Sequence, residues 1–98
     1  MNIEEIKREL DITWDDPDTD KKVEDAMRSA EALINDFAGQ SVDLTEDLVS
    51  AQLYKDAVRY YYNGVSDEFE TRYSSDLIAL RNKYRVKRYD ELEKADEV

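Results

Sequence analysis

Apolar residues recur at helical spacing from the start of the chain, which predicts a short first helix and a long second one. The first spans about residues 3–10 and carries its apolar face at Ile3, Ile6 and Leu10. The second runs to about residue 38, after an acidic loop at 11–19, and is expected to be capped by Asp18, Thr19 or Asp20. Its apolar face is formed by Val23, Ala26, Met27, Ala30, Leu33, Ile34, Phe37 and Ala38.

A third helix is predicted from a cap at Thr45 to about Asn63, and its apolar surface is unusually wide. One side carries Val49, Leu53, Tyr54, Ala57, Tyr60 and Tyr61, and the flank adds Ala51, Val58 and Tyr62. A helix that is apolar over more than half its circumference is either central in the fold or covered by a partner. Since each residue turns the helix by about 100°, Tyr62 lies away from Tyr60 and Tyr61. We predict that it contacts a neighbouring subunit or the fourth helix.

A fourth helix is indicated by apolar residues three and four positions apart, namely Phe69, Tyr73, Leu77, Leu80 and Tyr84. Its start is left open, because residues 66–73 could also form a loop. The sequence therefore predicts an all-α bundle of about four helices, one short and N-terminal, two long and central, and one C-terminal. We expect a single domain over residues 1–85 and a charged C-terminal tail, residues 86–98, that is disordered until assembly.

Composition narrows the possible functions. The 98 residues include no cysteine and no histidine, so disulfides, thiolate nucleophiles and the commonest general base are all missing. We therefore predict a protein that is not an enzyme and has no cofactor. The formal charge of −11 would repel a phosphate backbone, which argues against nucleic-acid binding by counterion release. No stretch is apolar enough for a membrane span, and the chain reads as a soluble protein made in a reducing cytoplasm.

The acidic loop is the most tempting chemical site. Asp16, Asp18 and Asp20 match the first three ligand positions of a calcium-binding helix–loop–helix motif. The pattern then fails, because Lys21 stands where the turn needs glycine and Met27 where the bidentate glutamate belongs. A loop followed by a helix cap explains the same residues, and calcium binding stays the alternative.

Three further groups are candidate interface residues. Trp14 lies in the acidic loop, either as a lid over the core of the second and third helices or as a contact residue for another chain. Arg85, Lys87 and Arg88 form a basic cluster. We expect this cluster to neutralise carboxylates of its own chain or of an identical neighbour, the alternative being nucleic acid or an acidic partner.

The order of these elements resembles the small all-helical head–tail connector (adaptor) proteins of tailed bacteriophages. The likeness covers about residues 3–85 and begins with the opening helix and its exit, IEEIKRELDI. It continues with the segment AEALINDFAG, which ends at Gly39, and with an aromatic-rich helix that ends in YYYN. The last matching pieces are DLIAL at residues 76–80 and the Tyr84-Arg85 pair.

This resemblance implies a structural virion protein without catalysis. Members of that family form a ring of identical subunits, typically about twelve, by cyclic association beneath the portal. The ring extends the DNA channel, through which DNA passes without specific binding, and offers a docking surface to the next head-closure or tail component. The implied location is the head–tail junction of the virion, after synthesis in the bacterial host cytoplasm. The alternative is an acidic DNA mimic, or another small interaction protein, that inhibits a host DNA-binding protein.

Overall fold

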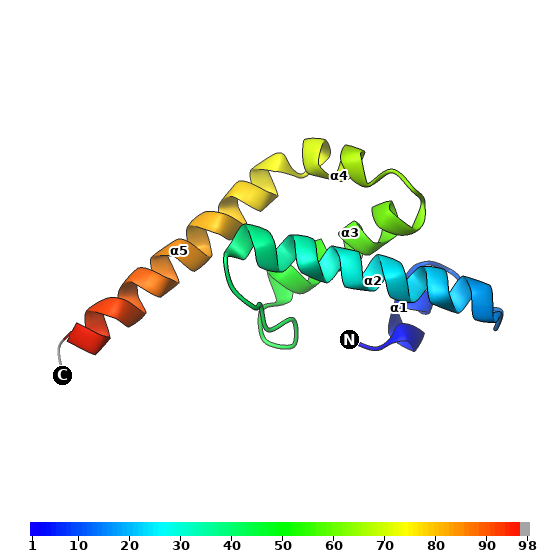
Figure 1. The fold of residues 1–98 in the computed structure, drawn as a ribbon, viewed down its shortest axis with the longest axis horizontal. Coiled ribbons are helices and arrows are strands. Elements are labelled where there is room, and N and C mark those ends of the chain that lie inside the picture. Colours follow the sequence, from blue (N-terminus) through cyan, green and yellow to red (C-terminus); the bar gives the residue numbers. More distant parts are fainter. Residues whose placement is uncertain (97–98) are drawn as a thin grey trace.

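The computed structural model describes the backbone of residues 1–96 and the side chains of residues 1–88, 90 and 91. Its described backbone is helical and the helices are joined by loops, so the predicted all-α fold is confirmed. The helices are α1 (Ile3–Glu9), α2 (Pro17–Ala38), α3 (Leu48–Tyr62), α4 (Ser66–Arg72) and α5 (Ser74–Asp96). Figure 1 shows α2 lying along α3. Helix α4 then reverses the direction of the chain, so that α5 passes the C-terminal end of α2.

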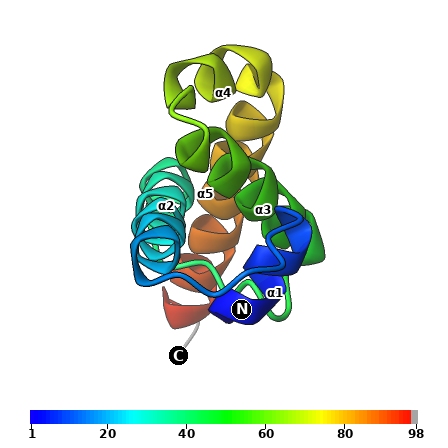
Figure 2. The same ribbon diagram turned by 90° about the vertical axis from the view of Figure 1, so that its right-hand side faces the viewer.

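The core lies between α2, α3 and α5, and Figure 2 shows these three helices around a common centre. Alanines on α2 allow α3 and α5 to approach closely, since Ala26, Ala30 and Ala38 are all buried. The largest fully buried side chains are Phe69, Ile6, Ile34, Leu77, Val23 and Val58. Every described helix contributes to this single core, α1 through Ile6 and α4 through Phe69.

Helix α2 begins earlier than the sequence predicts. Asp16, not a residue from 18 to 20, is the N-cap, and Pro17 occupies the first turn. The Asp16 carboxylate accepts a hydrogen bond from the backbone N–H of Asp18 at 3.4 Å and from the Thr19 hydroxyl at 3.0 Å. Proline suits this position because its fixed φ is helical and its missing N–H would have no intrahelical partner there.

Helix α3 begins later than the sequence predicts, at Leu48 and not directly after Thr45. Thr45 belongs to a turn in which its backbone N–H donates to the Asp43 carboxylate at 2.9 Å. Asp47 is the N-cap, and its carboxylate accepts from the Ser50 backbone N–H at 3.0 Å. The predicted cap, Thr45, therefore belongs to the turn that precedes the helix.

The C-terminal region differs from the single helix and tail that the sequence predicts. Residues 66–73 are not a loop, and the chain breaks at Tyr73 into two helices, α4 and α5. The break lets the Phe69 and Tyr73 rings stack at 4.5 Å and places both beside Tyr60. Helix α5 then continues to Asp96, so residues 86–96 have a helical backbone where a disordered tail was expected. The rest of that expectation, residues 97–98, lies outside the described residues.

The end of α2 provides a first test of the packing. Gly39 has a left-handed φ of +74°, and a Cβ there would collide with Nη1 of Arg88. We expect Gly39→Ala to lower the free energy of unfolding by about 2 kcal/mol, because left-handed strain adds to displacement of the Arg88 side chain. Urea unfolding followed by circular dichroism measures the loss.

Gly64→Ala is the matched control for that substitution. Gly64 has nearly the same φ, +73°, but nothing lies within 4 Å of a Cβ built there. It should cost only the strain of the left-handed backbone, about 1 kcal/mol. Equal losses for the two variants would show that Arg88 does not press against Gly39.

Candidate interaction surface

An open apolar groove separates α3 from α5. Its volume is about 590 Å³, and its lining is Leu48, Val49, Ser50, Gln52, Leu53, Asp56, Tyr73, Asp76, Ala79, Leu80 and Lys83. Leu53 and Leu80 are buried and therefore form the floor, whereas Asp56, Asp76 and Lys83 place charges along the sides. Such a groove has the composition of a surface that binds an apolar partner segment.

Leu48 and Val49 are the most exposed large apolar side chains of the groove, at 75% and 77% exposed. The sequence places Val49 on the apolar side of its helix together with Leu53 and Tyr54, and the chain itself leaves Val49 uncovered. The covered face of α3 is instead centred on Tyr54, Ala57 and Val58. Both exposed residues lie in the first turn of α3. The wide apolar arc of this helix is thus only partly used by its own chain.

Asp47 fixes the end of the groove by joining α3 to α5. Besides capping α3, its Oδ2 atom accepts from Nζ of Lys83 at 2.8 Å, from the Tyr84 hydroxyl at 2.8 Å and from the Ser50 hydroxyl at 2.7 Å. We call these four residues the Asp47 cluster. Burial alone would raise the pKa of the Asp47 carboxyl, but the donated hydrogen bonds outweigh it and hold this pKa well below its ordinary value. Burial and the Asp47 carboxylate raise the pKa of Tyr84 to about 12.

The basic cluster lies on α5 beside the end of α2. Arg88 donates to the carbonyl oxygens of Ala38 and Gly39, at 3.3 and 3.0 Å, where the α2 dipole is negative. Its partners in the chain are thus backbone carbonyls, where the sequence predicts carboxylates. Lys87 has its Nζ 5.5 Å from the centre of the Tyr84 ring, and Arg85 is exposed. Contacts of these three residues with another chain stay a prediction.

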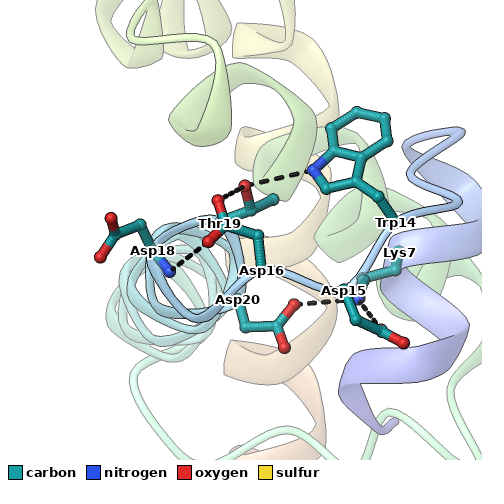
Figure 3. Close-up of polar contacts among 7 residues, drawn as sticks. All are labelled: Lys7, Trp14, Asp15, Asp16, Asp18, Thr19 and Asp20. Atoms are coloured by element: carbon teal, nitrogen blue, oxygen red, sulfur yellow. Dashed lines mark hydrogen bonds and ion pairs between the residues drawn. The ribbon is translucent and has the colours of Figure 1, made fainter.

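Trp14 is not a lid over the core. Its side chain is half exposed, at 51%, and lies outside the buried cluster. Figure 3 shows its indole beside the start of α2, where Nε1 donates to the Thr19 hydroxyl oxygen at 3.3 Å. The other reading, that Trp14 contacts another chain, stays a prediction.

Lys7 anchors the acidic loop from α1, although it is almost completely buried. Its Nζ lies 2.9 Å from Asp15 Oδ1 and 2.9 Å from Asp20 Oδ1, as Figure 3 shows. Hydrogen bonds to Asp20 and Asp15 outweigh the desolvation of this ammonium and raise its pKa above the ordinary lysine value. The lysine thus ties α1, the loop and the first turn of α2 together.

The carboxylates that suggested calcium do not converge on a common point. Asp16 faces the start of its own helix, Asp20 turns to Lys7, and Asp18 points away from both in Figure 3. Among the described residues no group of three or more potential ligands is arranged to hold a metal ion. The geometry therefore favours the loop-and-cap reading of these residues.

The three consecutive tyrosines Tyr60, Tyr61 and Tyr62 are all partly buried and pack against the core. Tyr60 lies 5.6 Å from the Phe69 ring, and Tyr61 lies beside Ser29 of α2. Tyr62 is also next to α2, where Nζ of Lys22 is 4.6 Å from the ring centre. Contact of Tyr62 with a neighbouring subunit stays a prediction.

Sequence reasoning missed the residues that shape the groove. An aspartate directly before an apolar run is typical of an N-cap, so Asp47 could have been found as the start of α3. Its bonds to Lys83 and Tyr84 join residues 36 and 37 positions apart and carry no local signal. The same holds for the exposure of Leu48 and Val49, which depends on where other helices lie.

Comparison with protein families, with curated proteins and with solved structures finds no match to this chain. Within the described part of the chain, no helix combines the length and the apolar character that crossing a membrane requires.

Proposed function

We propose that this protein is a structural subunit of a phage head–tail junction, where it binds the portal and identical neighbours and exposes a surface to the next neck component. The observation that carries the proposal is the groove between α3 and α5, whose exposed Leu48 and Val49 need a partner to leave water. The resemblance along residues 3–85 to small connector proteins supports the same assignment. Its role is assembly, without catalysis and without a cofactor.

The direct test is co-purification with the portal protein encoded in the same genome. The full chain should bind the portal at micromolar concentration and form rings with it in negative-stain images. No binding under these conditions would contradict the proposal.

A single substitution in the groove tests whether the groove takes part in that assembly. Val49→Asp should weaken portal-dependent assembly by about tenfold or more, because a carboxylate would have to be desolvated at the contact. Ile78→Asp is the matched control, since Ile78 is exposed on α5 but does not line the groove. Both substitutions replace exposed side chains, so the free energy of unfolding should change by less than about 0.5 kcal/mol. Equal assembly by both variants would remove the groove from the proposed contact.

The charge of −11 favours one other function, that of an acidic decoy for a DNA-binding protein. A decoy needs its carboxylates free and in rows. Asp15, Asp20 and Asp47 are instead paired with lysines of the chain. Displacement of labelled duplex DNA from a host nuclease at low salt would favour the decoy over the connector.

A further inference from the structure

The groove between α3 and α5 carries more negative than positive charge. Its one lining cation, Lys83, is already paired, because its Nζ lies 2.8 Å from Oδ2 of Asp47. Asp56 on α3 and Asp76 on α5 remain, and among the described residues neither forms an ion pair with a cation of the chain. One uncompensated carboxylate therefore stands on each side of the groove.

Asp56 keeps its charge although two cations lie close to it along α3. Lys55 and Arg59 are turned towards α1, where they donate to the side chain and the backbone carbonyl of Glu9, at 3.3 and 3.5 Å. Asp56 accepts from the side-chain amide of Gln52 at 3.2 Å. A neutral donor does not cancel the charge of the carboxylate, so a cation from outside the chain can still pair with it.

The hollow that continues the groove does not reverse this balance. Its charged lining is Glu46 and Asp47 against Lys83 and Lys87, so its charges cancel. The groove and the hollow together therefore present a net negative surface to an incoming partner, and an acidic partner would be repelled.

The apolar part of the groove sets the second requirement for its occupant. Leu53 and Leu80 form the buried floor, and Leu48 and Val49 are exposed beside it. A partner segment must cover these side chains with apolar residues of its own and carry cations along its edges. An amphipathic helix with apolar residues three and four positions apart and lysine or arginine on its flanks meets both requirements.

A second copy of the chain does not offer such a segment. Residues 77–88 contain five cationic side chains and no acidic one, but Leu77, Leu80 and Tyr84 of this segment are buried in the core of their own chain. Two copies also approach each other with a formal charge of −11 each, which opposes their association. The occupant that fits the groove is therefore a segment of a different protein.

We infer that the groove between α3 and α5 binds a cationic amphipathic segment of another protein, which is the portal in the proposed function. The apolar face of that segment covers Leu48 and Val49, and its cations pair with Asp56 and Asp76 on the two sides. The inference deepens the proposed function and rests on it, because it names the chemistry of the segment that the groove binds.

Fluorescence anisotropy with two labelled synthetic peptides tests this inference on the full-length protein. Both peptides are amphipathic helices with leucines three and four positions apart, and the remaining positions are lysine in one peptide and glutamate in the other. At low salt the lysine peptide should bind at least about tenfold more tightly, because only its side chains can pair with Asp56 and Asp76. Raised salt should reduce this preference.

Two matched double variants separate binding in the groove from attraction to the net charge of the chain. Asp56→Asn with Asp76→Asn removes two carboxylates from the groove. Glu24→Gln with Glu31→Gln removes two from the exposed side of α2, outside the groove. The groove variant should weaken binding of the lysine peptide about fivefold or more, and the α2 variant less than about twofold.

Val49→Asp and Ile78→Asp provide a second matched pair, since each adds one carboxylate to an exposed position. Attraction to net charge alone would make both variants bind the lysine peptide more tightly. Val49→Asp should instead weaken binding about tenfold, because it places a carboxylate in the apolar contact. Ile78→Asp should not weaken binding, since Ile78 does not line the groove.

Equal binding of both peptides, or equal effects of the two double variants, would overturn the inference. Self-association of the unchanged protein that the groove variant abolishes would also overturn it, because the occupant would then be a second copy. Portal binding that the groove variant leaves unchanged would overturn it while the proposed function stands. Selective binding of the lysine peptide in the groove without any portal binding would contradict the proposed function and keep the cationic segment as the occupant.

Discussion

Phe69→Ala is expected to lower the free energy of unfolding by about 4 kcal/mol, which is a large part of the stability of a small domain. Phe69 is the largest fully buried side chain, with no exposed surface. Its ring stacks on Tyr73 at 4.5 Å and meets Tyr60 at 5.6 Å. Removing it leaves a cavity where α4 meets α3, and it takes away the contact that holds the break at Tyr73 in place.

Urea unfolding followed by circular dichroism measures this loss, and Phe69→Leu is the matched control. Leucine refills much of the volume but not the stacked ring, so it should cost about 1–2 kcal/mol. Amide hydrogen exchange should show that residues 66–72 lose protection first in the alanine variant. A loss below about 1 kcal/mol for alanine would mean that α4 does not pack on α3 as described.

Asp47→Ala is the second large expected effect, a loss of about 3 kcal/mol. The substitution removes the N-cap of α3 and leaves the Tyr84 and Ser50 hydroxyls without their acceptor. Lys83, which is half exposed, can turn to water and contributes little to the loss. Asp47→Asn is the control, because it keeps the capping oxygen but replaces Oδ2 with an amide NH2 group, which cannot accept from the Tyr84 and Ser50 hydroxyls. It should cost about half as much.

The pH dependence of stability provides an independent test of the Asp47 cluster. Because the folded protein holds the pKa of Asp47 below its unfolded value of about 3.9, this stabilisation is complete above about pH 5 and is lost as the pH falls further. Asp47→Ala should therefore flatten the fall in the free energy of unfolding below pH 5. An acid limb as steep as that of the unchanged protein would contradict the cluster.

Tyr84 contributes to the free energy of unfolding with the opposite pH dependence. Its pKa is raised to about 12, so its contribution is complete below about pH 10 and decreases as the pH rises from 10 to 12. Tyr84→Phe removes this alkaline loss while keeping the buried ring. Tyr54, whose pKa burial also raises to about 12, retains its share of the alkaline loss in that variant.

Helix periodicity predicted most elements but placed several of their ends wrongly. Gly39 ends α2 as expected, because only a residue tolerant of positive φ suits that position. Helix α2 is capped by Asp16 and not by a residue from 18 to 20. Several neighbouring acidic residues can each cap a helix, and the backbone conformation decides which of them does. The spacing of Phe69, Tyr73 and Leu77 fits one continuous helix, yet the chain breaks at Tyr73 to stack two rings beside Tyr60.

The sequence by itself determined the all-α class, the first three helices and the absence of cysteine and histidine chemistry, because periodicity and composition are local properties. It also showed that the third helix has more apolar surface than a small core needs. Only the tertiary structure decided which part of that surface is covered. The packing of α5 places Lys83 and Tyr84 on Asp47 and leaves Leu48 and Val49 open. Such contacts depend on how distant helices pack, and spacing along one helix carries no information about them.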